Sequence, residues 1–143
     1  MKTRISMLFM FALGILTIGA ITGRAQITNQ IEFKMSQPFT VANTTLPAGS
    51  YVIKPVSGTD QTMLEISGVG GTPSVMVEVD TIQPDAAKGG SHVTFNKYKN
   101  VLALSEVFPG RANSGYRLVQ GHPEKLAAKT EQPTKQSVPS TVK

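Results

Sequence analysis

Apolar and polar residues alternate along much of the chain between residues 30 and 120. The clearest example is V-M-V-E-V-D at residues 75–80, where a valine occupies every second position. Because successive side chains of a β-strand point to opposite faces of a sheet, this spacing predicts a strand with one face on a hydrophobic core. The run V-L-A-L-S-E-V-F at residues 101–108 is apolar on both faces, and it predicts a central strand that is covered on both sides.

Turn signals separate these runs into short strands. In residues 38–53, Phe39 and Tyr51 belong to two alternating runs, and the L-P-A-G between them turns the chain. The K-N at residues 99–100 separates two later runs in the manner of a tight hairpin. We therefore predict strands within residues 26–35, 39–42, 50–56, 63–67, 75–79, 92–98, 101–108 and 115–120.

This many short strands with frequent turns is typical of an all-β domain. We predict a single small antiparallel β-barrel or β-sandwich of about seven to eight strands over residues 26–120. Residues 121–129 are expected to form a short C-terminal helix, in which Pro123 suits the first turn. Residues 130–143 are rich in Gln, Pro, Thr, Ser and Lys without a pattern, and we predict that this tail is disordered.

The first 25 residues indicate export. They contain a short basic start, an apolar run at residues 7–21 and small residues at positions 23 and 25. This is the layout of a secretory signal peptide, with cleavage predicted after Ala25. An uncleaved membrane anchor is the alternative, since the apolar run approaches the length of a short transmembrane helix. We therefore expect a periplasmic or secreted protein.

Charge and cysteine content narrow the function classes. The formal net charge is +5, but residues 26–120 carry seven basic and seven acidic side chains. The excess positive charge thus belongs to the leader and the tail, which is poor support for nucleic-acid binding. The chain has no cysteine, and this excludes thiol catalysis and thiolate metal sites.

No motif for catalysis stands out. An enzyme would need a cluster such as His92 with Glu78, Asp80 or Glu106 within hydrogen-bond reach, and His122 has no partner of this kind in its motif. Glu78 and Asp80 leave the same face of a strand and could share a cation, although a solvated face explains them better. We predict no catalytic, cofactor-binding or metal-binding residues, and no cofactor.

Three further stretches resemble binding or modification motifs, and the first two have simpler structural explanations. The glycines of residues 67–71 precede a strand rather than a helix, which favours a turn over a phosphate-binding loop. K-Y-K at residues 97–99 resembles a nucleic-acid platform, but exposed lysines are common at hairpin ends. N-T-T at residues 43–45 matches a glycosylation sequon. The aromatic residues after the leader are expected to form the core rather than line a ligand cavity.

Two stretches resemble a group of small exported bacterial proteins of uncharacterised function. They are F-T-V-A-N-T-T-L-P-A-G-S-Y at residues 39–51 and F-N-K-Y-K-N-V-L-A-L-S-E-V-F at residues 95–108. The group shares F-x-V, four variable residues, L-P-A-G-x-Y, a hairpin strand that ends in Tyr, a G-x-x-L strand and a short charged helix. The matching residues are Phe39, Val41, Leu46, Pro47, Ala48, Gly49, Tyr51, Phe95, Tyr98, Gly115, Leu118, Glu124, Leu126 and Ala127. The resemblance implies a compact β-fold and export, and no activity or active-site residue.

A second, shorter resemblance concerns residues 46–53. Their pattern L-x-x-G-x-Y-x-I is similar to a strand entry in prealbumin-like sandwich domains of bacterial surface proteins. It implies a structural or adhesive module, which would need an unpaired edge strand, with residues 50–55 as the first candidate.

We therefore expect a non-catalytic β-domain that acts as a binding or envelope-associated module. The alternatives are the prealbumin-like adhesive module and a barrel that binds a small apolar ligand. The expected partner is a protein or a small apolar ligand of the cell envelope. We expect no nucleic acid, and no stable membrane insertion once the signal is cleaved.

Overall fold

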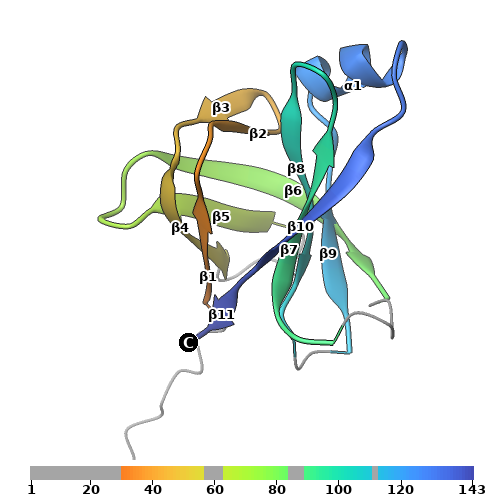
Figure 1. Ribbon diagram of the computed structural model, residues 1–143. Helices are drawn as coiled ribbons and strands as arrows, with labels where there is room; N and C mark the ends of the chain where they lie inside the picture. The colour runs from red at the N-terminus through yellow and green to blue at the C-terminus, as the bar shows by residue number, and fades with distance from the viewer. Residues whose placement is uncertain (1–29, 57–62, 84–88, 111–112) are drawn as a thin grey trace, which may run out of the picture.

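The computed structural model describes residues 30–56, 63–83, 89–110 and 113–143. The predicted signal peptide, with its cleavage site, lies outside the described residues. Within them the chain forms eleven strands and one helix (Figure 1). In chain order these are β1 (Ile31–Met35), β2 (Phe39–Val41), β3 (Thr44–Leu46), β4 (Gly49–Pro55), β5 (Met63–Gly68), β6 (Ser74–Ile82), β7 (His92–Lys97), β8 (Leu102–Phe108), β9 (Gly115–Leu118), α1 (His122–Ala128), β10 (Thr134–Pro139) and β11 (Thr141–Val142).

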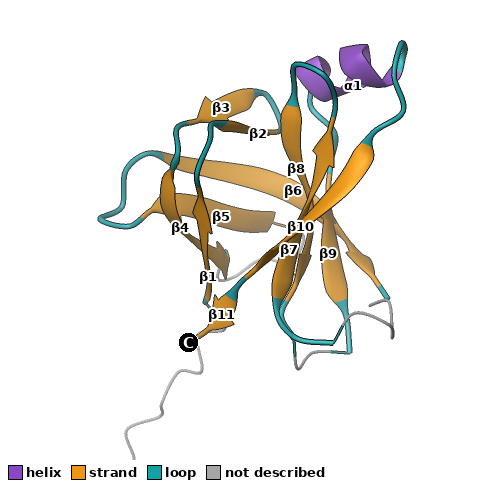
Figure 2. Cartoon of the chain, in the orientation of Figure 1, coloured by secondary structure: helices purple, strands orange, loops and turns teal. Residues whose placement is uncertain are grey.

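The strands form two layers that face each other across the core. In the order of pairing, the path runs β10-β7-β8-β9-β6-β5-β4-β1-β11, and the hairpin β2–β3 joins the side of β8. One layer holds β11, β1, β4, β5 and the first half of β6. The other holds the second half of β6 with β9, β8, β7 and β10. Strands dominate the cartoon, and the only described helix lies at one end of it (Figure 2).

Strand β6 and the segment formed by β10 and β11 each contribute to both layers. Strand β6 pairs with β5 through residues 74–78 and with β9 through residues 79–82, so it passes from one layer into the other. At the far ends of the path, β10 pairs with β7 and β11 pairs with β1, although only Ser140 separates β10 from β11. In sandwiches the strands that change sheets form the corners. The sheet is not closed into a barrel, so a sandwich-like arrangement describes the fold.

Aromatic side chains fill the space between the layers. Phe33, Phe39, Tyr51 and Phe95 form a cluster in which neighbouring ring centroids are 5.0–6.2 Å apart. These distances are those of edge-to-face and offset ring pairs, which stabilise a core beyond the burial of their area. Aliphatic residues from both layers complete the core, among them Ile31, Ile53, Leu64, Ile66, Val93, Leu104 and Val107.

Most of the predicted elements are confirmed. Strand β6 buries Val77 and Val79 and exposes Met76, Glu78 and Asp80, as the alternation predicted. Strand β8 lies between β7 and β9 and buries every residue except Glu106, which is half-buried. The predicted helix at residues 121–129 is α1, with proline in its first turn.

Three sequence predictions were wrong. The tail at residues 130–143 is not disordered throughout, because β10 and β11 pair along β7 and β1 and so gain backbone hydrogen bonds that their polar composition did not indicate. The described residues form eleven strands rather than seven or eight, since the tail adds β10 and β11 and the turn after the predicted strand at residues 39–42 leads into the short β3. Residues 50–55 do not form an edge, because β4 pairs with β1 on one side and with β5 on the other.

Candidate functional site

The residues considered for catalysis do not come together. His92 makes one hydrogen bond, between its Nδ1 and the Gly90 carbonyl oxygen at 3.0 Å, and its ring stacks on Phe108. No carboxylate of the described chain bonds to this histidine. Glu106 instead forms ion pairs with Arg117 and Lys135. The side chain of His122 is exposed on α1. A histidine–carboxylate pair is therefore absent from the described residues.

The other stretches considered for binding behave as local structure. Glu78 and Asp80 lie on the exposed face of β6, and the described residues contain no group of three or more His, Cys, Asp or Glu that could hold a metal ion. The glycine-rich stretch after β5 is a turn, closed by bonds from Gly68 N to Pro73 O and from Gly71 N to Gly68 O, both 2.8 Å. Tyr98 is buried, so its ring cannot serve as an open platform for a base.

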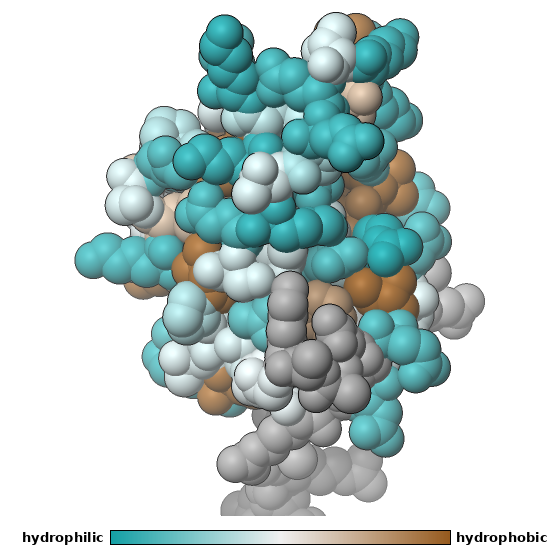
Figure 3. Space-filling model, turned by 45° about the vertical axis from the view of Figure 1, so that its right-hand side comes forward, coloured by the Kyte–Doolittle hydropathy of each residue, from teal (hydrophilic) through white to brown (hydrophobic). Residues whose placement is uncertain are grey.

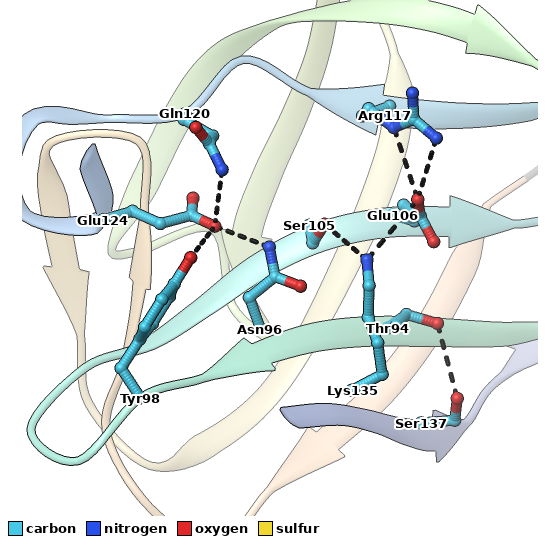
Figure 4. A network of polar contacts seen from close by, with 10 residues as sticks. All are labelled: Thr94, Asn96, Tyr98, Ser105, Glu106, Arg117, Gln120, Glu124, Lys135 and Ser137. Atoms are coloured by element: carbon cyan, nitrogen blue, oxygen red, sulfur yellow. Dashed lines mark hydrogen bonds and ion pairs between the residues drawn. The ribbon is translucent and has the colours of Figure 1, made fainter. Parts of the chain in front are cut away.

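A polar network on the outer face of the second layer is the most developed arrangement of functional groups (Figure 4). Its centre is Glu124, which stands in the first turn of α1 and is only 4% exposed. One carboxylate oxygen, Oε1, accepts hydrogen bonds from Asn96 Nδ2 at 2.6 Å, Tyr98 OH at 3.4 Å and Gln120 Nε2 at 3.3 Å. The donors come from β7, from the residue after it and from the residue two positions before α1, so the carboxylate ties the helix to the sheet.

The orientation of Asn96 follows from the chemistry of its partner. An ionised carboxylate only accepts hydrogen bonds, so the amide nitrogen of Asn96 must face Glu124. Its Oδ1 then points away and has no hydrogen-bond partner within the described structure, although it is buried. A buried acceptor without a partner is destabilising, and the bond to Glu124 has to outweigh this cost.

A second cluster lies beside the first on the same face (Figure 4). Glu106 Oε1 is 3.2 Å from Arg117 Nη2 and 3.6 Å from Lys135 Nζ, and Lys135 also donates to Ser105 Oγ at 3.4 Å. These residues come from β8, β9 and β10. The side chains of Arg117 and Lys135 are about half exposed, so each ion pair contributes little to stability.

The electrostatics of the network agree with a structural role. Burial raises the pKa of Tyr98 above its usual value of 10.0, and the charge of Glu124 and the hydrogen bond to it raise this pKa further. The phenol therefore stays protonated at neutral pH and acts as a donor. All three donors bond to the same carboxylate oxygen of Glu124, which fits a role in holding α1 against the sheet.

The start of α1 is fixed by the tip of the β2–β3 hairpin. The Asn43 Oδ1 accepts a hydrogen bond of 2.7 Å from the backbone N–H of His122, so it caps the helix from a distant part of the chain. Gly121 lies against Ala42, and a Cβ at this position would stand 1.8 Å from the Ala42 carbonyl oxygen. Ala42 itself has a φ of 50°, a value that non-glycine residues rarely adopt. The asparagine of the predicted sequon thus has a structural task.

Sequence reasoning missed the importance of Glu124, Asn96 and Asn43. The resemblance included Glu124 and Tyr98 as matching positions, but it gave them no role. A glutamate in the first turn of a short polar helix is typical of a solvated face, and its burial here involves Asn96 of β7, which is 28 positions away in the sequence. The spacing of these residues carries no signal from which the contact could have been found.

Comparison of the chain with protein-family models, with curated proteins and with solved structures finds no match. Across the described parts of the chain, none of the helical structure has the length and apolar character that a membrane crossing requires.

Proposed function

We propose that the protein is an exported, non-catalytic binding module of the cell envelope, which holds an extended segment of a partner protein along the β5–β6 hairpin. The observation that carries this proposal is an unpaired strand edge at residues 74–77 of β6. On one side these residues pair with β5, and on the other side no described strand pairs with them, because β9 begins to pair only at Val79.

The direction of the backbone groups supports a role for this edge. The Pro73 carbonyl oxygen bonds to Gly68 N on the β5 side, whereas the Glu78 carbonyl oxygen bonds to Val119 N on the β9 side. Since successive residues of a strand direct their N–H and C=O groups to alternate sides, those of Ser74 and Met76 point away from β5. A partner strand can pair with these groups, as in other cases of β-strand addition.

The side chains around the edge indicate what kind of segment would fit. Met76 and Val69 are 59% and 66% exposed, the highest values among the large hydrophobic residues described, and both belong to this hairpin. Glu78 and Asp80 lie on the same outward face as Met76 and form no ion pair with another described residue. An extended segment with an apolar residue over Met76 and a basic residue near Glu78 would complement this surface.

The alternatives have less support. A barrel for small apolar ligands needs an open interior, and here the rings of Phe33, Phe39, Tyr51 and Phe95 occupy it. On the face shown in Figure 3, hydrophilic residues predominate and hydrophobic ones form separate small areas. An adhesive module remains compatible with the same β6 edge, but not with the β4 strand that the sequence suggested.

The experiment compares capture of a partner by variants of the edge. The mature protein is immobilised, incubated with an extract of its native envelope and cross-linked, and the bound proteins are identified by mass spectrometry. Met76→Glu places a charge on the hairpin, and Met76→Pro removes the N–H that faces the free edge without removing a bond to β5. Leu126→Glu on α1 is the matched control, since Leu126 is also exposed. We expect both Met76 variants to lose a partner that the control retains; a partner that all variants retain would contradict the proposal.

A further inference from the structure

The C-terminal segment at residues 134–143 is attached to the fold mainly through its backbone and polar side chains. It contains β10, which pairs with β7 from Thr134 to Pro139, and β11, which pairs with β1. Most of its side chains are exposed, and Val138 is its one residue that packs against the described core. Releasing this segment would therefore expose little apolar surface.

Specific contacts nevertheless recognise the segment along its whole length. Lys135 meets Glu106, Ser137 Oγ lies 3.4 Å from Thr94 Oγ1, and Ser140 Oγ lies 2.5 Å from Ser91 Oγ. At the far end, Lys143 Nζ is 2.9 Å from Glu32 Oε1, and Lys143 N donates to Gln30 O. We call the surface along the edges of β7 and β1, to which these contacts are made, the β7–β1 slot. The side chains of residues 134–143 match this slot.

None of these contacts depends on the segment belonging to the same chain. They are made to β7, β8, β1 and the residues beside them, and none is made to α1, from which the segment continues. The connection at residues 130–133 is short and mostly exposed, and it contains Pro133. A segment from a second copy would make the same contacts in the slot, so exchange needs only the release of the segment and a change in the connection.

We propose that two copies of this chain exchange residues 134–143 reciprocally, each placing its segment in the β7–β1 slot of the other. The partner is a second copy because the slot matches this sequence at Lys135, Ser137, Ser140 and Lys143. Since the contacts are equal in the monomer and in the dimer, protein concentration sets the balance between them. This inference does not depend on the β6 edge.

Cysteine trapping tests the exchange directly, since the chain has no cysteine of its own. Thr94→Cys and Ser137→Cys are made as separate full-length variants, mixed and incubated, and then oxidised with glutathione disulfide. Thr94 is 1% exposed and faces Ser137 in the register, so a thiol at 94 is reached by a segment in the slot and not by random collision. We expect a disulfide-linked heterodimer on a non-reducing gel, with the 94–137 link identified by peptide mass.

Two controls make a negative result decisive. The double variant Thr94→Cys/Ser137→Cys should close its disulfide within one chain, because paired positions in a sheet are within disulfide range. A mixture of Ser50→Cys and Ser137→Cys reports random collision, since Ser50 is exposed on β4. We expect several-fold more heterodimer from the first mixture than from this one, rising with concentration; equal amounts would overturn the proposal. Should Thr94→Cys fail to fold, Ser91→Cys and Ser140→Cys repeat the test, with the double variant Ser91→Cys/Ser140→Cys as the intramolecular control. If neither double variant closed its disulfide, the slot itself would be refuted.

Discussion

Replacement of Glu124 by alanine should lower the stability of the protein by more than is usual for a substitution on a short surface helix. The change removes the acceptor of three donors and leaves Asn96 Nδ2 and Tyr98 OH without a partner. Both residues are about 95% buried, at 6% and 5% exposed. Gln120, by contrast, is exposed, so its amide can return to water.

The expected magnitude follows from the two buried donors. A buried donor without a partner costs roughly 1–3 kcal/mol. The Asn96 bond is short, and that of Tyr98, at 3.4 Å, is at the weak end of the range. We therefore expect Glu124→Ala to lower the free energy of unfolding by about 3 kcal/mol, which is a large part of the roughly 5–15 kcal/mol typical of a small domain.

A matched variant separates the charge from the hydrogen bonds. Glu124→Gln keeps an oxygen acceptor and the shape of the side chain, and it loses the additional strength that an ionised acceptor gives, about 1 kcal/mol. Glu78→Gln is the control on an exposed face, where a change within about 0.5 kcal/mol is expected. The assay is urea denaturation of the mature chain followed by circular dichroism, with the free energy taken from the midpoint and slope.

A double-mutant cycle completes the test. Asn96→Ala and Glu124→Ala remove the two ends of the 2.6 Å bond, so the double variant should lose less stability than the sum of the single ones. Strict additivity, or a cost of Glu124→Ala below that of Glu124→Gln, would refute the view that this carboxylate holds α1 on the sheet.

Three other outcomes are expected. Ala42→Gly should raise the free energy of unfolding by about 0.5–1 kcal/mol in urea melts, because glycine tolerates a φ of 50°, whereas Gly121→Ala should lower it through the clash with residue 42. Since the folded-state pKa of Tyr98 is raised, the stability linked to it is complete below pH 10 and is lost as pH rises through the folded pKa; Tyr98→Phe should flatten the decline of stability above pH 10, and an unchanged slope would contradict this. We expect mass spectrometry of the N-terminal peptide, from protein isolated from its native cells, to show a start at Gln26, and a start at Met1 would indicate an uncleaved anchor.

The strands that could be predicted from the sequence are those whose apolar residues mark which faces contact the core. Strand β6 could be predicted because its valines alternate with charged residues, and β8 because it is apolar on both faces. Strand β10 could not, since Lys135, Ser137 and Pro139 are exposed and its stability comes from backbone bonds to β7. Such bonds depend on the position of another strand and leave no pattern in the composition.

The candidate site was not predictable from spacing. The residues considered for chemistry, such as His92 and Glu78, proved to be locally bonded or solvated. Glu124, a buried residue whose carboxylate accepts three hydrogen bonds in the described structure, stands in a segment that the sequence predicted only as a short helix. Its burial follows from the packing of α1 on β7, and this packing exists only once the sheet has formed.

The pairing of β11 with β1 also bears on the order of folding. It joins Ile31 to Val142, residues near opposite ends of the described chain, and such distant contacts carry a high loop-closure entropy and form slowly. During synthesis from the N-terminus, β1 and β4 emerge long before residues 141–142. The outer edge of β1 and the edge of β7 therefore stay open until residues 134–142 have emerged, and we expect the docking of this segment to be a late step that gives the sandwich its native cooperativity.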